Sequence, residues 1–91
     1  MNLKSIHNVY FIGIGGIGMS AIARYFAVNG KKVAGCDVVA SQITEDLADF
    51  GVEVHFEDAV TNIPISFLNK GKTLVVYTPA ITDNHKEFNY L

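Results

Sequence analysis

Apolar residues along the chain recur with two different spacings, and the spacing changes from one segment to the next. Short apolar or alternating runs predict four strands, at 9–12, 33–37, 52–56 and 73–77. Apolar residues three and four positions apart predict helices over 16–29 and 41–50, and a polar helical stretch over 84–91. Alternating strands and helices predict an α/β fold, a Rossmann-like, doubly wound parallel sheet in three layers.

The signals that end and begin these elements agree with that order. Gly30 follows the first helix and supplies the left-handed conformation that ends many helices, and Gly51 has the same place after the second. Ser41 is a suitable N-cap for the second helix. No linker or repeat divides residues 1–91, so we expect one domain whose sheet stops before its last strand, as in an N-terminal fragment of a longer protein.

The turn between the first strand and the first helix contains four glycines within six residues, Gly13, Gly15, Gly16 and Gly18. The spacing Gly-x-Gly-x-x-Gly is typical of dinucleotide-binding turns. There the first glycine permits a tight turn, the second lets the main chain approach a phosphate, and the third lets the helix pack closely against the strand. The first turn of the helix adds unpaired N–H groups and the positive end of its dipole. The loop is therefore predicted to bind an anion.

Asp37 ends the second predicted strand, about 20 positions after Gly18, where this fingerprint places an acidic residue near a ribose or base. The alternative is an ordinary aspartate that opens a turn. In a parallel sheet, ligands lie outside the carboxyl ends of the strands. We therefore expect the loops 13–20, 37–41 and 78–83 to meet in one crevice.

Charge and composition argue against several classes of protein. The chain has 7 Lys and Arg against 9 Asp and Glu, a net charge of −2, and no basic cluster, which argues against nucleic acid or an anionic membrane as a partner. No apolar run reaches the ~18 residues of a membrane span. Cys36 is the only cysteine, so no intrachain disulfide forms, and a cytoplasmic location fits. The apolar run near the N-terminus is too rich in glycine to favour a signal peptide.

Candidate catalytic and metal-binding residues are few. His7, His55 and His85 are dispersed without the spacing of a metal site, and Cys36 lies in a small-residue strand and is expected in the core. The chain has no Gly-x-Ser-x-Gly elbow and no Gly-x-x-x-x-Gly-Lys-Ser/Thr loop. We therefore expect no catalytic residue and no metal site in this chain.

The glycine loop, Asp37 and the segment after the fourth strand together resemble the N-terminal domain of the bacterial Mur ligases. The similarity extends over essentially all of the chain and is found in His7–Ser20, Gly35–Asp37, Ser41, Thr44, Gly51–Val54 and Val75–Ile81. The sequence Gly-Gly-x-Gly-Met-Ser at 15–20 resembles these ligases more than the nicotinamide dehydrogenases, which seldom carry it.

The resemblance implies a three-domain enzyme in which this domain binds the UDP moiety of UDP-N-acetylmuramate. A central ATPase domain and a C-terminal domain of the same chain would complete the site. The complete enzyme would use ATP and Mg²⁺ to form an acyl phosphate and join L-alanine to it in peptidoglycan precursor synthesis. This fragment alone would be inactive and would bind no cofactor beyond the UDP-sugar substrate.

The resemblance also implies which residues bind UDP. They lie in the three loops at the carboxyl ends of the strands: Gly13, Gly15, Gly16, Ile17, Gly18, Met19, Ser20, Asp37, Ser41, Thr78, Pro79, Ala80 and Ile81. The main chain of the glycine loop would hold the pyrophosphate, Asp37 would accept hydrogen bonds from uridine, and the last four residues would line the nucleoside side. Many relatives carry a histidine near the nucleotide after the third strand, where this chain reads Phe56-Glu57-Asp58.

Two alternatives of different classes stay open. The glycine spacing with Asp37 also suits the adenosine ribose of NAD(P), as in a dehydrogenase or a redox-sensing regulator. The second alternative is an interaction domain that binds no nucleotide, in which the glycines serve only a tight turn.

Overall fold

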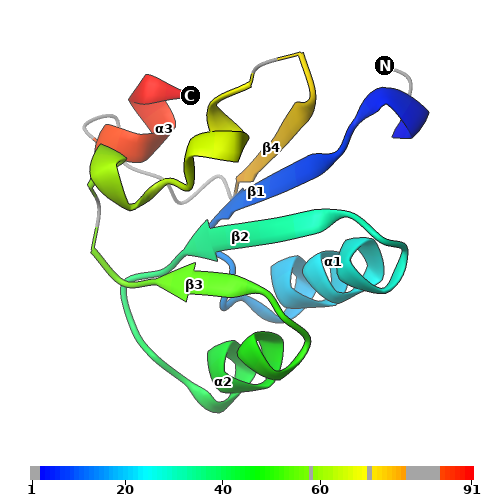
Figure 1. The fold of residues 1–91 in the computed structure, drawn as a ribbon. Helices are drawn as coiled ribbons and strands as arrows, with labels where there is room; N and C mark the ends of the chain where they lie inside the picture. Colours follow the sequence, from blue (N-terminus) through cyan, green and yellow to red (C-terminus); the bar gives the residue numbers. More distant parts are fainter. Residues whose placement is uncertain (1–2, 58, 70, 78–84) are drawn as a thin grey trace.

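The structure is a computed structural model that describes residues 3–57, 59–69, 71–77 and 85–91 (Figure 1). Its elements follow in the order 3₁₀ helix Leu3–Ser5, β1 Asn8–Ile12, α1 Ile17–Val28, β2 Lys32–Cys36, α2 Gln42–Asp49, β3 Glu53–His55, 3₁₀ helices Val60–Asn62 and Ile65–Leu68, β4 Thr73–Tyr77 and α3 Lys86–Tyr90. The four predicted strands and the first two predicted helices are confirmed. The last helix is shorter than the polar stretch predicted for it.

The four strands form one parallel sheet in the order β3-β2-β1-β4. β1 lies inside the sheet and all five of its residues are buried. Ile12 pairs with Cys36 on one side and with Tyr77 on the other, so the carboxyl ends of β1, β2 and β4 lie at one level. β3 and β4 form the two edges of the described sheet. The first four residues of β4 are half-buried and its last residue is exposed.

The two faces of the sheet carry separate cores because side chains alternate along each strand. Val9 and Phe11 belong to the cluster on the face covered by α1 and α2. Tyr10 and Ile12 belong to the opposite cluster, where Phe67 from the second of the two later 3₁₀ helices packs (Figure 1). The sheet and its two covering layers confirm the predicted three-layer α/β architecture.

The helix boundaries follow the signals in the sequence. Ser41 and Thr44 form a capping box at the start of α2, with the Ser41 hydroxyl accepting from the Thr44 N–H at 3.3 Å. Gly30 and Gly51 both have φ of +83°, after α1 and α2 respectively. No helix among the described residues combines the length and hydropathy that a bilayer-crossing segment requires.

Close packing requires a glycine at a position other than the one predicted. A Cβ atom on Gly35 in β2 would lie 2.5 Å from the Phe11 carbonyl oxygen and 2.9 Å from Cδ1 of Ile14. A Cβ atom on Gly18 would meet no atom of the described residues within 4 Å. The expectation that Gly18 lets α1 pack closely against the strand is therefore wrong for the described strands, and the tight contact in this sheet is instead between Gly35 of β2 and Phe11 of β1.

We expect Gly35→Ala to lower the free energy of unfolding by about 1–3 kcal/mol, because the added methyl group overlaps a backbone carbonyl that cannot turn away. The matched variant Gly18→Ala adds the same methyl group where the described residues leave room. Alanine also favours a helix over glycine by about 1 kcal/mol, so this variant should be neutral or stabilising. Urea denaturation of both variants checks the pair, and equal losses would contradict the assignment.

Candidate functional site

The loops after β1 and β2 are joined by main-chain hydrogen bonds at the carboxyl edge of the sheet. The N–H groups of Gly13 and Ile14 both donate to the Cys36 carbonyl oxygen, at 2.9 and 3.0 Å. Gly13 has φ of +89°, a conformation that only glycine adopts without strain, so the tight turn predicted there is confirmed. The chain then turns directly into α1.

Asp37 forms the second connection between the two loops. Its Oδ2 atom accepts a hydrogen bond of 2.7 Å from the Gly15 N–H, and Oδ1 accepts one of 2.7 Å from the Val38 N–H. A Cβ atom on Gly15 would lie 2.8 Å from Oδ2, so a side chain there would displace the carboxylate. In this structure the group that approaches the main chain at Gly15 is thus the Asp37 carboxylate. Uridine recognition by Asp37 stays a prediction.

The start of α1 offers N–H donors that other described groups do not use. Gly16 is the N-cap and has no side chain to cap the helix. Among the described residues, no hydrogen bond is made by the N–H groups of Ile17, Gly18 and Met19. These donors and the positive end of the helix dipole face the same end of the helix. They form a local electropositive site without a charged side chain.

Ser20 differs from the other residues predicted in this loop. Its N–H donates to the Gly16 carbonyl at 2.8 Å, and its buried hydroxyl donates to the Ile17 carbonyl at 3.0 Å. The N–H of Gly16 also has a partner, the Gly13 carbonyl oxygen at 3.3 Å. Fewer N–H groups of this loop are therefore available to a ligand than the sequence predicts.

Exposed apolar side chains lie next to these donors. Ile17 is 83% exposed at the start of α1, and Val38 is 85% exposed directly after Asp37. Single exposed aliphatic residues are common on protein surfaces, so these two add apolar surface near the donors without marking a site by themselves. Ser41 lies at the end of the same loop, and Thr78, Pro79, Ala80 and Ile81 lie outside the described residues.

A hollow of about 380 Å³ lies at the end of the sheet opposite to the glycine loop. Its lining includes Lys31, Lys32 and Glu53. The Lys31 ammonium already donates to the Ile6 carbonyl at 2.6 Å. Ligands of parallel sheets lie at the carboxyl ends of the strands, whereas β2 and β3 begin at this hollow. The carboxyl edge is therefore the better candidate.

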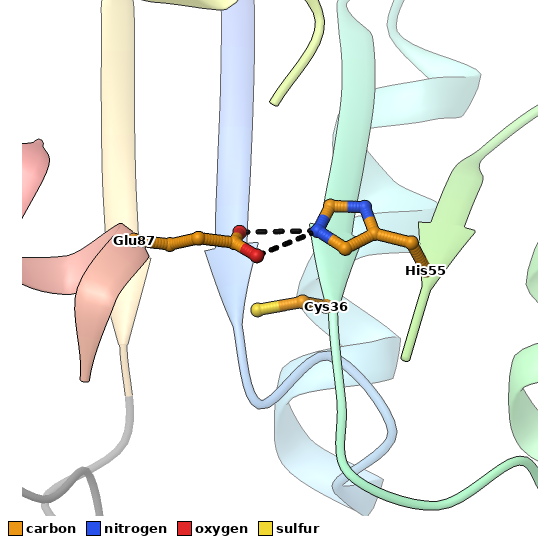
Figure 2. A group of neighbouring side chains, drawn as sticks. All are labelled: Cys36, His55 and Glu87. Atoms are coloured by element: carbon orange, nitrogen blue, oxygen red, sulfur yellow. Dashed lines mark hydrogen bonds and ion pairs between the residues drawn. The ribbon is translucent and has the colours of Figure 1, made fainter. Parts of the chain in front are cut away.

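A group of polar side chains that the sequence does not indicate lies under the other face of the sheet. Glu87 in α3 is fully buried and accepts hydrogen bonds from the Tyr10 hydroxyl and from the Ala59 N–H. The His55 imidazole lies 2.9 Å from Glu87 Oε2, and Cys36 points toward both (Figure 2). Burial raises the pKa of the Tyr10 phenol well above its ordinary value, and the hydrogen bond with Glu87 raises the pKa further.

His55 therefore lies among potential ligand atoms in space, although the residues that supply them are not near it in the sequence. His55 and Glu87 are far apart along the chain, and the periodicity of a short polar helix does not indicate which residue turns inward. The alternation along β3 indicates only that the side chains of His55 and Val54 point to opposite faces of the sheet. The expectation that Cys36 is a core residue is confirmed, since it is 3% exposed.

Comparison with protein families matches residues 8–91 to the family described as "Mur ligase family, catalytic domain". The chain is 52% identical over 90 residues to UDP-N-acetylmuramate--L-alanine ligase of Flavobacterium johnsoniae, covering 99% of this chain and 20% of that protein. It is 54% identical over 82 residues to the ligase of the same name from Porphyromonas gingivalis, covering 90% and 18%. The chain thus spans about a fifth of the length of these relatives.

Among solved structures, a similar fold occurs in UDP-N-acetylmuramate:L-alanyl-gamma-D-glutamyl-meso-diaminopimelate ligase from Neisseria meningitides. The TM-score is 0.73 at 19% identity, covering 92% of this chain and 25% of that chain. At this level of identity the likeness supports the fold, the α/β arrangement around a parallel sheet, and says nothing about the ligand.

We expect Asp37→Ala to loosen both loops, because its carboxylate holds the N–H groups of Gly15 and Val38. The loss in free energy of unfolding should be about 1–2 kcal/mol, near the lower range for charge-assisted hydrogen bonds because the side chain is half-buried. Amide hydrogen exchange at these two residues should be faster. Asp49→Ala, at an exposed position at the end of α2, should leave both measurements unchanged. Unaltered exchange at Gly15 would contradict the role given to Asp37.

Proposed function

The chain belongs to the Mur ligase family, and on this basis we propose that it binds the UDP moiety of UDP-N-acetylmuramate. The observation on which the proposal depends is the start of α1, where the N–H groups of Ile17, Gly18 and Met19 have no partner among the described residues. Identity of about half over nearly the whole chain to L-alanine-adding ligases supports this substrate over other anions.

The pyrophosphate would be held by main-chain donors. No Lys or Arg occurs in residues 13–20 or 37–41, so charge-assisted hydrogen bonds from N–H groups are the available interaction. Each such bond contributes about 1.5–3 kcal/mol, and the helix dipole adds to them. Glycine at position 18 leaves the main chain accessible to a phosphate oxygen.

The uridine would lie toward the loop after β2. Asp37 Oδ2 has a further lone pair beyond the bond that it accepts from the Gly15 N–H, so a uridine N–H or hydroxyl group can donate to it, whereas Oδ1 already accepts from the N–H groups of Val38 and Val39. The exposed Val38 side chain offers apolar surface to the ring. We expect Ser41 and the segment 78–81 to complete this side.

ATP and Mg²⁺ would be bound by another part of the enzyme. This chain has no Gly-x-x-x-x-Gly-Lys-Ser/Thr loop. In many enzymes such a loop binds the phosphates of a nucleoside triphosphate through its main-chain N–H groups and its lysine. The chain spans only about a fifth of its relatives' length, so we assign it substrate binding. Phosphorylation of the muramate carboxylate and attack by L-alanine would take place in the complete, cytoplasmic ligase.

We expect Gly15→Val to reduce affinity for UDP-N-acetylmuramate at least tenfold, because its Cβ would displace the Asp37 carboxylate and its methyl groups would enter the loop. Isothermal titration calorimetry measures the affinity. Gly71→Val is the matched control, since Gly71 lies in an exposed turn where, of the residues that the structure describes, a Cβ would meet only Asn69 Oδ1, at 3.6 Å. Near-native circular dichroism with undiminished affinity in Gly15→Val would refute the loop as the binding site.

Competition between nucleotides separates the proposal from its rivals. We expect UDP and UDP-N-acetylmuramate to raise the melting temperature of the chain and NADH to leave it unchanged. Enhanced NADH fluorescence that UDP does not reverse would instead favour a nicotinamide-binding domain. Stabilisation by neither nucleotide would favour an interaction domain.

A further inference from the structure

Three side chains with metal-binding atoms converge below the carboxyl ends of β2 and β3. Cys36 is the last residue of β2, His55 is the last residue of β3, and Glu87 lies in α3. Their ligand atoms all lie within 4.8 Å of one another, and the side chains point toward a shared space (Figure 2). Three elements that are distant in sequence thus supply one thiol, one imidazole and one carboxylate.

The separation of the His55 and Glu87 ligand atoms can be compared with that around a tetrahedral metal ion. Zinc bonds of about 2.0–2.1 Å to nitrogen and oxygen place two such ligands about 3.3 Å apart, and a bond of about 2.3 Å to sulfur gives about 3.5 Å. His55 Nε2 and Glu87 Oε2 are 2.9 Å apart. Binding of the ion would require this pair to widen by a few tenths of an ångström and the Cys36 Sγ, which lies within 4.8 Å of both atoms, to complete the set.

We propose that Cys36, His55 and Glu87 form a binding site for a zinc-class divalent cation. Thiolate and imidazole select zinc over calcium and magnesium, which prefer oxygen ligands alone. A thiolate and a carboxylate together balance the charge of the ion, which matters because Glu87 is fully buried and Cys36 nearly so. Three protein ligands leave the fourth position to a water molecule.

The groups around the three ligands hold them in place. The Tyr10 hydroxyl donates to Glu87 Oε1, and the Ala59 N–H donates to Oε2 at 3.1 Å, so the carboxylate is oriented before any ion binds. The His55 side chain is 17% exposed, which provides a path from solvent. This site lies on the face of the sheet opposite α1 and α2 and needs no nucleotide, so it is independent of the function proposed above.

Cobalt titration of the purified, tag-free chain tests the proposal, after removal of metals with a chelator. We expect a thiolate-to-cobalt charge-transfer band and strong visible bands of a tetrahedral site, saturating at one equivalent and displaced by Zn²⁺. Zn²⁺ should also raise the melting temperature. Cys36→Ser should abolish the charge-transfer band, and His55→Gln and Glu87→Gln should each weaken Co²⁺ binding at least tenfold.

His7→Gln is the matched control, because His7 is an exposed histidine outside the cluster, and it should bind Co²⁺ as the unaltered chain does. Absence of the charge-transfer band at saturating Co²⁺ would overturn the site and leave the cluster as a hydrogen-bond network that fastens α3 to the sheet. Equal affinity in His55→Gln and the unaltered chain would overturn it as well. If Glu87→Gln fails to fold, the spectra of the unaltered chain and of Cys36→Ser still decide.

Discussion

The hydrogen bonds between the loop after β1 and the end of β2 are the constraint on which the candidate site depends. The Cys36 carbonyl holds the two N–H groups that start the turn, and the Asp37 carboxylate holds the next one at Gly15. These bonds follow from the parallel register that sets Ile12 opposite Cys36. The N–H of Gly16 donates to the Gly13 carbonyl, so all four loop N–H groups are occupied and the donors without a described partner begin at Ile17, the first residue of α1. The sheet register thus decides where an anion can bind.

Much of this arrangement could be predicted from the sequence because it depends on local chemistry. Apolar periodicity is enough to predict the strands of the sheet. The N-cap at Ser41 and the end of α1 at Gly30 follow from the preferences of single residues at helix ends. The glycine fingerprint correctly predicts the tight turn at Gly13. The role of Gly18 was wrong for a physical reason. Whether a Cβ fits depends on how close a neighbouring strand lies, and in this sheet the tight contact is between Gly35 and Phe11.

The buried polar cluster could not be predicted because its members are joined only by the fold. Glu87 lies in a polar segment whose pattern is typical of an exposed helix, yet α3 turns it inward onto Tyr10 and His55. A carboxylate in such a position is stable only when its lone pairs are satisfied. The cluster of Tyr10, Cys36, His55 and Glu87 therefore stabilises the covering layer, and the last three side chains bring a thiol, an imidazole and a carboxylate close together.

The two edge strands of the described sheet, β3 and β4, differ in how well they can pair with a further strand. β3 pairs along only three residues, whereas β4 lies along the full length of β1 and keeps its outer main-chain groups without a neighbouring strand in the described sheet. Its half-buried apolar residues Leu74, Val75 and Val76 are suited to a flanked position. The β4 edge therefore presents main-chain groups with which a further strand can pair. A strand added to β4 would therefore enlarge the sheet on the side of β1 that lies away from β2.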